Sequence, residues 1–137
     1  MSEENKALAR KFLQMFDLGD PGMADKIVAA DYYNHDAPDP NIGSDGVKAS
    51  VTMFKKAFPD AELKIAFQLA EGDKVTTRYQ WSGTHQGEIY GIPATGKQVN
   101  ITSTVTFRVA DGKIHEAWQN SDQWGAMQQL GVTPSPG

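Results

Sequence analysis

The stretch VTFRVADGKIHEAW, residues 105–118, decides the fold class of this chain. Its centre, Asp111-Gly112, separates two runs of alternating apolar and polar residues, which is a strong short-range signal for a β-hairpin. A two-residue turn pairs Val109 with Ile114. The same register, counted outward, pairs Phe107 with Glu116. Because directly opposed residues lie on the same side of a sheet, this register predicts which side chains face the core.

The register assigns one face of the hairpin to the core. We expect that face to carry six apolar residues: Ile101, Val105, Phe107, Val109, Ile114 and Trp118. Four polar residues fall on the same face: Ser103, Glu116, Asn120 and Asp122. The opposite face is expected to carry Asn100, Thr102, Thr104, Thr106, Arg108, His115 and Gln119. The assignment depends on the turn type, since a slip of one residue exchanges the two faces.

The rest of the chain shows helical patterns first and strand patterns afterwards. Apolar residues at helical spacing predict helices over residues 2–18, 21–30 and 44–58, and residues 32–36 are expected to be extended. Alternation predicts strands over 63–69, 75–81, 98–109 and 113–122, followed by a helix over 124–130. This order indicates an α+β fold, with helices packed on one face of a curved antiparallel sheet. We expect one domain over residues 1–132 and a short flexible tail over 133–137.

Composition and charge exclude several classes of protein. The 137 residues suffice for one domain, and the absence of cysteine excludes disulfides, thiolate zinc sites and a cysteine nucleophile. A net charge of −4 gives no electrostatic drive toward nucleic acid or an anionic membrane. No apolar run reaches the ~20 residues of a membrane span. The first residues are acidic where a signal peptide would be basic, which favours a cytoplasmic location.

Asp122 is the first candidate for a catalytic residue. A carboxyl group on an apolar face is costly unless it is paired, solvated or protonated, and such a setting suits general acid/base chemistry. The alternative is that Asp122 caps the helix that follows it through a side-chain oxygen. Among the histidines, His85 shares the inward parity of Tyr79 and Trp81, whereas His115 falls on the polar face.

Several stretches of the chain share their order and composition with a known family. They are WSGTHQG at 81–87, GIPATGK at 91–97, DGKI at 111–114, and Glu116, Trp118, Asp122 and QQLG at 128–131. These motifs resemble the SnoaL-like polyketide cyclases, and residues 32–36 resemble the histidine-bearing first strand of that family. The family belongs to the nuclear transport factor 2-like superfamily. The resemblance implies a cone-shaped, cystatin-like α+β barrel with an apolar pocket between the sheet and the N-terminal helices.

The resemblance also implies a reaction. In these cyclases an aspartate on the last strand acts as acid/base in an intramolecular aldol ring closure, which needs no cofactor, and the matching residue here is Asp122. We expect hydrogen-bond donors at His35, His85 and Asn34. The residues expected to bind a small hydrophobic, carbonyl-bearing, polyketide-like substrate are Tyr33, Asn34, Tyr79, Phe107, Trp118 and Asn120. The resemblance further implies a homodimer or higher homo-oligomer formed through the sheet.

Two other functions stay open at this point. The same fold could serve as a non-catalytic protein that binds a small apolar molecule. An epoxide hydrolase or a dehydratase is the third possibility. A hydrolase needs an aspartate–arginine–aspartate arrangement, for which Arg78 and Arg108 are the nearest candidates, and Arg108 falls on the polar face. No metal site is expected, because no two histidines have the spacing of metal ligands.

Overall fold

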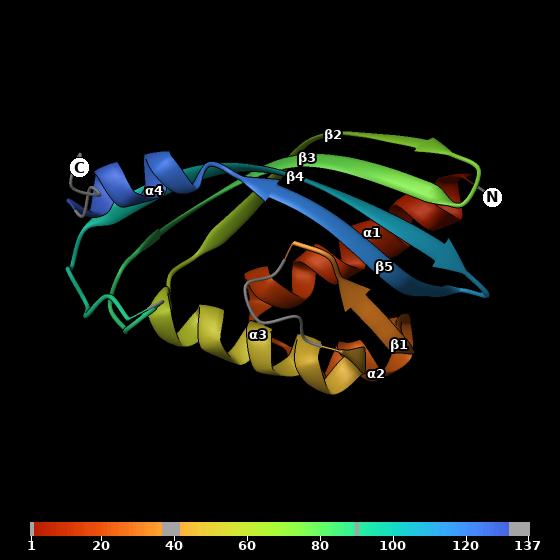
Figure 1. The fold of residues 1–137 in the computed structure, drawn as a ribbon, viewed down its shortest axis with the longest axis horizontal. Helices are drawn as coiled ribbons and strands as arrows, with labels where there is room; N and C mark the ends of the chain where they lie inside the picture. The colour runs from red at the N-terminus through yellow and green to blue at the C-terminus, as the bar shows by residue number, and fades with distance from the viewer. Residues whose placement is uncertain (1, 37–41, 90, 132–137) are drawn as a thin grey trace.

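The computed structural model describes residues 2–36, 42–89 and 91–131. It consists of helices on one side of a five-stranded sheet (Figure 1). The helical elements are α1 (Ser2–Leu18), the 3-10 turn η1 (Pro21–Met23), α2 (Ala24–Ile27), α3 (Gly43–Ala57) and α4 (Gln123–Leu130). The strands are β1 (Val28–Asn34), β2 (Glu62–Glu71), β3 (Lys74–Thr84), β4 (Gln98–Ala110) and β5 (Lys113–Ser121). The α+β fold expected from the sequence is confirmed. The tail expected at 133–137 lies outside the described residues.

The helix ends follow the local signals in the sequence. Helix α1 stops before Gly19, which adopts a positive φ of 67° that suits glycine. The side chain of Asp20 then accepts a hydrogen bond from the N–H of Gly22, with Pro21 at the first position of the turn. Helix α4 ends at Gly131, which has a φ of 77°. The signals at Gly19 and Asp20 place the short connection between α1 and η1.

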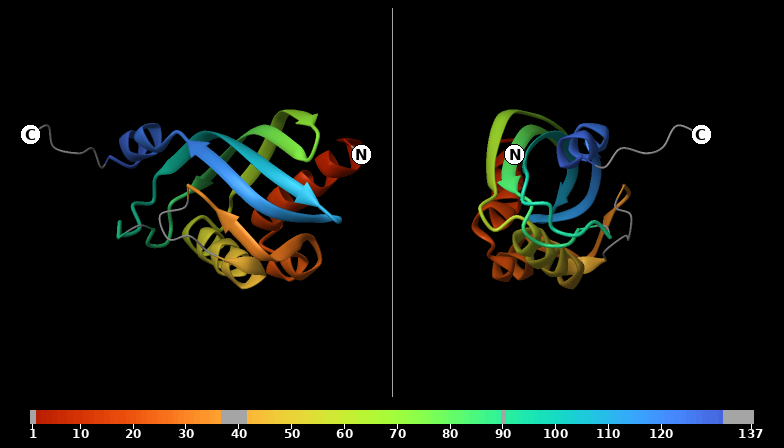
Figure 2. Two further views of the ribbon diagram at one scale, coloured as in Figure 1. Left: turned by 45° about the vertical axis from the view of Figure 1, so that its right-hand side comes forward. Right: turned by 90° about the vertical axis from the view of Figure 1, so that its left-hand side faces the viewer.

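The strand order in the sheet is β1-β5-β4-β3-β2. The β2, β3, β4 and β5 strands are antiparallel neighbours, whereas β1 pairs with β5 in parallel. The sheet is therefore mixed, which differs from the antiparallel sheet expected from the sequence. It curves over α1, α2 and α3, and α4 lies at the end where β5 finishes (Figures 1 and 2). The two hairpin turns, between β2 and β3 and between β4 and β5, lie at the opposite end of the sheet.

The register of the central hairpin is correct at the turn and wrong beyond it. Ala110 pairs with Lys113 and Val109 with Ile114, and Asp111 takes a φ of 54° as its turn type requires. A β-bulge then inserts His115, so that Arg108 rather than Phe107 is opposite Glu116. An extra residue reverses the parity of every later side chain in β5. Ala117, Gln119 and Ser121 therefore share the inner face with Phe107, Val105 and Ser103.

This bulge corrects four expectations. Glu116, Trp118 and Asn120 are opposite Arg108, Thr106 and Thr104, on the outer face of the sheet rather than on the core face. Asp122 follows the last paired residue of β5 and is not part of the inner face at all.

A second bulge changes the exposure of β2. Ile65 pairs with Tyr79, but the register shifts before Phe67, which pairs with Arg78. Gln68 and Ala70 then face inward, and Phe67 and Leu69 face outward. These two apolar side chains are 54% and 64% exposed. The outer face of the sheet therefore carries apolar surface that α1, α2 and α3 do not cover.

The space between the sheet and the helices is filled by two apolar clusters. The larger one joins α1 to β3, β4 and β5, and Phe12 contacts Phe107 at a ring distance of 4.7 Å. The smaller cluster lies at the end of α3 and includes Phe58, Ile101 and Leu130 of α4. Burial of these side chains is the main contribution that holds the helices against the sheet. Among the described helices, none is long and apolar enough to cross a membrane.

Candidate functional site

A line of polar side chains crosses the inner face of the sheet. Tyr79 of β3, Ser103 of β4 and Ser121 of β5 are directly opposite one another. The hydroxyl groups of Ser103 and Ser121 are hydrogen-bonded at 2.8 Å. The side-chain amide of Gln119 donates to the hydroxyl of Tyr79 at 2.8 Å, and Asn34 of β1 donates to Gln119 at 3.3 Å. We call these five residues, Asn34, Tyr79, Ser103, Gln119 and Ser121, the inner network.

Two members of the inner network are shielded from solvent, and the other three, Asn34, Gln119 and Ser121, are half-buried. Tyr79 is 5% exposed and Ser103 is fully buried. Burial raises the pKa of the Tyr79 phenol above its usual value, and hydrogen bonds with Ser103 and Gln119 offset part of that rise. Burial likewise raises the pKa of the neighbouring Tyr32. Both phenols therefore keep their protons through neutral pH and can act as hydrogen-bond donors.

Such a network is expensive to maintain inside an apolar core. Each buried polar group must keep its partners, because a lost hydrogen bond leaves a desolvated donor or acceptor. The amide of Gln119 donates to the Tyr79 oxygen, so the phenol hydrogen is left to donate elsewhere. The hydroxyl of Ser103 already donates to the carbonyl of Asn120 at 3.2 Å, so the phenol of Tyr79 is the donor that this arrangement can present to a carbonyl oxygen.

Asp122 stands at the edge of this network rather than within it. Its backbone N–H donates to the carbonyl of Thr102 at 3.0 Å, directly after Ser121. Its carboxylate is exposed and accepts a hydrogen bond from the N–H of Gly125 at 2.8 Å, as the N-cap of α4. The cap is thus the alternative that the structure shows, and the expectation of a carboxyl buried on the core face is wrong. The carboxylate nevertheless sits at the end of the strand that carries Gln119 and Ser121.

Gly125 lets the Asp122 carboxylate lie close to the helix. A Cβ atom at position 125 would come within 2.1 Å of Oδ2 of Asp122. Any larger residue would therefore push the carboxylate away from its present position. The absence of a side chain at position 125 therefore leaves room for the Asp122 carboxylate in its capping position.

His85 lies on the inner side of the sheet, as its parity indicates. It is fully buried, and its ring packs against Phe58 at 5.5 Å. Its Nδ1 is 3.0 Å from the hydroxyl of Thr95. Tyr79 and Phe107, two of the expected wall residues, are also buried on the inner face, and the inward placement of all three is confirmed.

His35 occupies the other side of the sheet. Its Nε2 is 2.7 Å from a carboxylate oxygen of Glu116, and its ring stacks on Trp118 at 4.8 Å. Arg108 forms an ion pair with the same carboxylate, and Tyr33 meets His35 edge-on. Hydrogen bonds from His35 and Arg108 lower the pKa of Glu116.

The expected site residues fall into two groups, one on each face of the sheet. His35, Tyr33 and Trp118 form an ion-paired, aromatic surface on the outer face, so the expectation that they line the interior is wrong. Asn120 is likewise exposed on the outer face, opposite Thr104. Asn34 is the only expected binding residue of β1 that the described chain places in the inner network. Arg78 and Arg108 also face outward, where Arg78 donates to Thr104.

The sequence interpretation missed Gln119 and Ser121 as members of the site. Both have the wrong parity in an uninterrupted hairpin, and only the bulge at His115 turns them inward. A signal was present, because a regular register places the large Trp118 opposite Val105 but also forces Glu116 and Asn120 into the core. Two unpaired polar residues in a buried strand face are evidence for a register shift.

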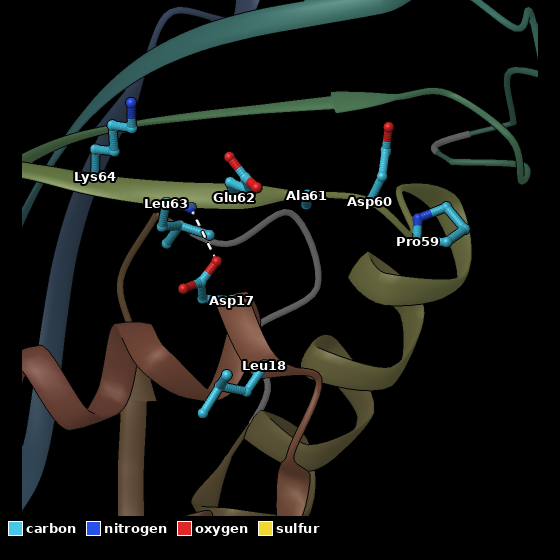
Figure 3. Close-up of a pocket in the computed structure, with 8 residues that line it drawn as sticks. All are labelled: Asp17, Leu18, Pro59, Asp60, Ala61, Glu62, Leu63 and Lys64. Carbon is cyan, nitrogen blue, oxygen red and sulfur yellow. Dashed lines mark hydrogen bonds between the residues drawn. The ribbon is translucent and has the colours of Figure 1, made fainter.

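A groove of about 440 Å³ lies outside the cone, between the end of α1 and the start of β2 (Figure 3). Two of its carboxylates, those of Asp17 and Asp60, already have structural partners. Asp17 accepts from the N–H of Leu63 at 3.1 Å, and Asp60 accepts from both the N–H and the hydroxyl of Thr84 at 2.7 Å. These two carboxylates therefore hold α1 and the end of β3 against β2, and the groove shares no residue with the inner network.

Fold and inner face together define a class of protein: a small α+β barrel with polar side chains on the concave side of a curved sheet. The family model of the SnoaL-like polyketide cyclases matches residues 6–130. The chain belongs to this family.

Curated relatives and solved structures agree with this placement. The chain is 28% identical over 134 residues to the aklanonic acid methyl ester cyclase DnrD of Streptomyces peucetius, covering 94% of this chain and 92% of the relative. It is equally similar to the cyclase DauD of Streptomyces sp. strain C5, with 83% of that relative covered. The solved structure of TsrD from Streptomyces laurentii superimposes with a TM-score of 0.88 at 28% identity, over 95% of this chain and 96% of TsrD.

Proposed function

We propose that this protein is a cofactor-independent cyclase that closes a ring within a hydrophobic, carbonyl-bearing, polyketide-like molecule. Asp122 acts as the general acid/base, and the inner network donates hydrogen bonds to the substrate. The observation that carries the proposal is the position of Asp122, which directly follows Ser121 at the end of the inner network. The names of the two Streptomyces relatives, which are cyclases of aklanonic acid methyl ester, support the same reaction class.

The proposed reaction is an intramolecular aldol addition. The Asp122 carboxylate takes a proton from a carbon next to a carbonyl group, and the enolate that forms attacks a second carbonyl of the same molecule. A carbon–carbon bond forms, and the resulting alkoxide receives the proton back from Asp122. The phenol of Tyr79 donates a hydrogen bond to the enolate oxygen as charge develops on it. The product is an isomer of the substrate.

Product analysis tests this proposal. The protein is incubated with aklanonic acid methyl ester, and the mixture is analysed by chromatography with mass spectrometry. A cyclase gives a new compound with the mass of the starting material. Gain or loss of one water would instead indicate a hydrolase or a dehydratase. Saturable binding of an unchanged compound would indicate a non-catalytic binding protein.

We also propose that the chain self-associates through the outer face of the sheet. Phe67 and Leu69 are exposed there beside polar residues of β3, β4 and β5, and the helices of the cone lie on the other side (Figure 2). Burial of exposed apolar side chains against a second copy is favourable in proportion to the area removed from water. Because the inner network lies on the concave side of the sheet, this association would not cover it.

A further inference from the structure

His85 has one ring nitrogen that nothing in the described chain satisfies. The side chain is fully buried, yet its Nε2 has no hydrogen-bond partner among residues 2–36, 42–89 and 91–131. Buried polar atoms in folded proteins are nearly always hydrogen-bonded, so an isolated one requires an explanation. Neither the fold nor the proposed aldol step uses this atom.

The partners of Nδ1 assign the tautomer of the ring. The backbone N–H of Thr95 points at Nδ1 at 3.2 Å, and a backbone N–H can only donate. The hydroxyl of Thr95 is 3.0 Å from the same atom, and it accepts from the N–H of Lys97 at 3.3 Å, which leaves its own hydrogen for Nδ1. Nδ1 is therefore an acceptor, and Nε2 carries the ring hydrogen. The unsatisfied group is an N–H donor.

The surrounding backbone holds this donor in place. The N–H of His85 donates to the carbonyl of Lys97 at 2.9 Å, and the carbonyl of His85 accepts from Gly96 at 2.8 Å. The next residues are tied to the end of α3, because both Gln86 and Gly87 donate to the carbonyl of Ala57. A donor fixed in advance loses little entropy when an acceptor arrives.

Aromatic side chains of the smaller apolar cluster pack in a row beside His85, and we call this row of Phe54, Phe58 and Trp81 the aromatic wall. Its ring is tilted against Phe58, and Phe58 meets Trp81 at 4.8 Å. Trp81 in turn contacts Phe54 at 4.9 Å. Flat apolar molecules pack well against such rings, and the N–H adds a requirement for one hydrogen-bond acceptor. The chemistry on this wall therefore suits a planar hydrophobic molecule that bears a carbonyl oxygen.

We propose that the Nε2–H of His85 binds a carbonyl oxygen of a flat, hydrophobic ligand and so selects ketones over hydrocarbons of the same shape. This inference rests on the proposed function only in placing the ligand inside the cone. The backbone N–H of His85 donates to Lys97, just before β4, whereas that of Asp122 donates to Thr102 within β4. At the rise of a β-strand, Lys97 and Thr102 are roughly 15 Å apart. The contact therefore anchors a part of the ligand that is distant from the reacting carbon.

Two compounds that differ by one carbonyl group test the proposal. 9-Fluorenone and fluorene have the same planar ring system, and only the ketone has an acceptor. Their affinities are measured by quenching of tryptophan fluorescence in the wild-type protein, in His85→Phe and in the control Leu18→Phe, a change at an exposed position at the end of α1. We expect the wild type and the control to prefer fluorenone by about tenfold, the value of one hydrogen bond, and His85→Phe to bind both compounds equally. Equal affinities in the wild type, a preference that persists in His85→Phe, or no saturable binding would overturn the proposal.

A second measurement does not depend on a folded variant. In wild-type protein labelled with nitrogen-15, the resonances of the His85 Nε2–H group should shift on addition of fluorenone and stay unchanged on addition of fluorene. If these resonances do not shift on addition of fluorenone, the Nε2–H group does not bind the ketone, and the proposal is wrong. Fluorenone has nothing to cyclise, so these results stand apart from turnover. A wild-type protein that cyclises its substrate but does not prefer fluorenone would overturn this inference alone. A wild-type protein that prefers fluorenone but cyclises nothing would overturn the proposed function alone.

Discussion

Single side chains of this protein divide by the face of the sheet that they occupy. Tyr79, Ser103 and Gln119 point into the cone and bond to one another, whereas His35 and Trp118 stack on the outside. Adjacent positions of one strand thus serve different purposes, since successive side chains alternate between the two faces. The chemistry that we propose for the inner face uses hydroxyl and amide donors, with one carboxylate after the end of β5.

Replacement of Gly125 by alanine tests whether the direction of the Asp122 side chain matters. The added Cβ would meet the Asp122 carboxylate and displace it. Loss of the cap costs about 1 kcal/mol, and the gain in helix propensity from glycine to alanine is of similar size. We therefore expect Gly125→Ala to leave the melting temperature nearly unchanged while turnover falls about tenfold or more. Thermal unfolding and steady-state kinetics check both parts, and full turnover in the variant would argue against a role for this geometry.

The sequence predicts the inner residues only where the strand is regular. Tyr79, Phe107 and His85 follow simple alternation, and all three are buried on the inner face. Gln119 and Ser121 do not, because the bulge at His115 shifts their parity. His115 is held there by long-range partners, with Nε2 3.1 Å from the carbonyl of Ala110 and Nδ1 3.2 Å from Asp31 of β1. The polar residues that a regular register forces into the core indicate that the register shifts, but a bulge stabilised by a distant strand cannot be located from the hairpin sequence alone.

At the scale of elements, the sequence predicts most helices and strands, but the helix expected over 21–30 ends at Ile27, where β1 follows. It predicts the hairpin turn and not the parallel partner of β1. The helical periods, the caps at Asp20 and Gly131 and the turn at Asp111-Gly112 are local features, and each is found in the structure. The parallel pairing of β1 with β5 joins segments that are far apart in the chain. Such pairing depends on tertiary contacts, among them the hydrogen bond between His35 and Glu116.

Glu116 is expected to stabilise the contact between β1 and β5 in a pH-dependent way. Its pKa lies below the usual 4.5, so its contribution to stability is present above that value and is lost as the pH falls through the lowered pKa. Glu116→Gln should therefore unfold at lower urea concentration than the wild type at about pH 7, with a smaller difference at about pH 3. Glu71→Gln, an exposed control on β2, should match the wild type at both values. A difference for Glu116→Gln that grows as the pH falls would contradict this role.

For the whole molecule, the curved sheet separates the concave face, on which we propose the chemistry, from the convex face, through which we propose association. The helices α1, α2 and α3 fill the wide part of the concave side, and α4 closes on the end of β4 (Figure 1). The sequence predicted this overall shape through a family resemblance, because curvature and the packing of layers are not readable from periodicity alone. An interior pocket and an oligomeric interface stay predictions.

Charge on the outer face should break the proposed self-association. We expect the wild-type protein to sediment as a dimer or a larger oligomer, and the double variant Phe67→Arg, Leu69→Arg to sediment as a single chain, because two cations would be buried against a second copy. Leu18→Arg, an exposed residue at the end of α1, is the matched control and should keep the oligomer. Analytical ultracentrifugation gives the mass of each form. A monomeric wild type, or a double variant that still associates, would count against an interface on this face.

The most direct test of the proposed chemistry is the turnover of Asp122→Asn. Asparagine caps a helix as well as aspartate does, so this variant keeps the N-terminus of α4 and removes only the ability to exchange a proton. Asp111→Asn, the same change in the exposed hairpin turn, is the control. We predict that Asp122→Asn folds and binds aklanonic acid methyl ester as the wild type does but loses at least about a hundredfold in kcat, whereas Asp111→Asn is fully active. Wild-type kcat in Asp122→Asn would show that Asp122 is a helix cap and nothing more.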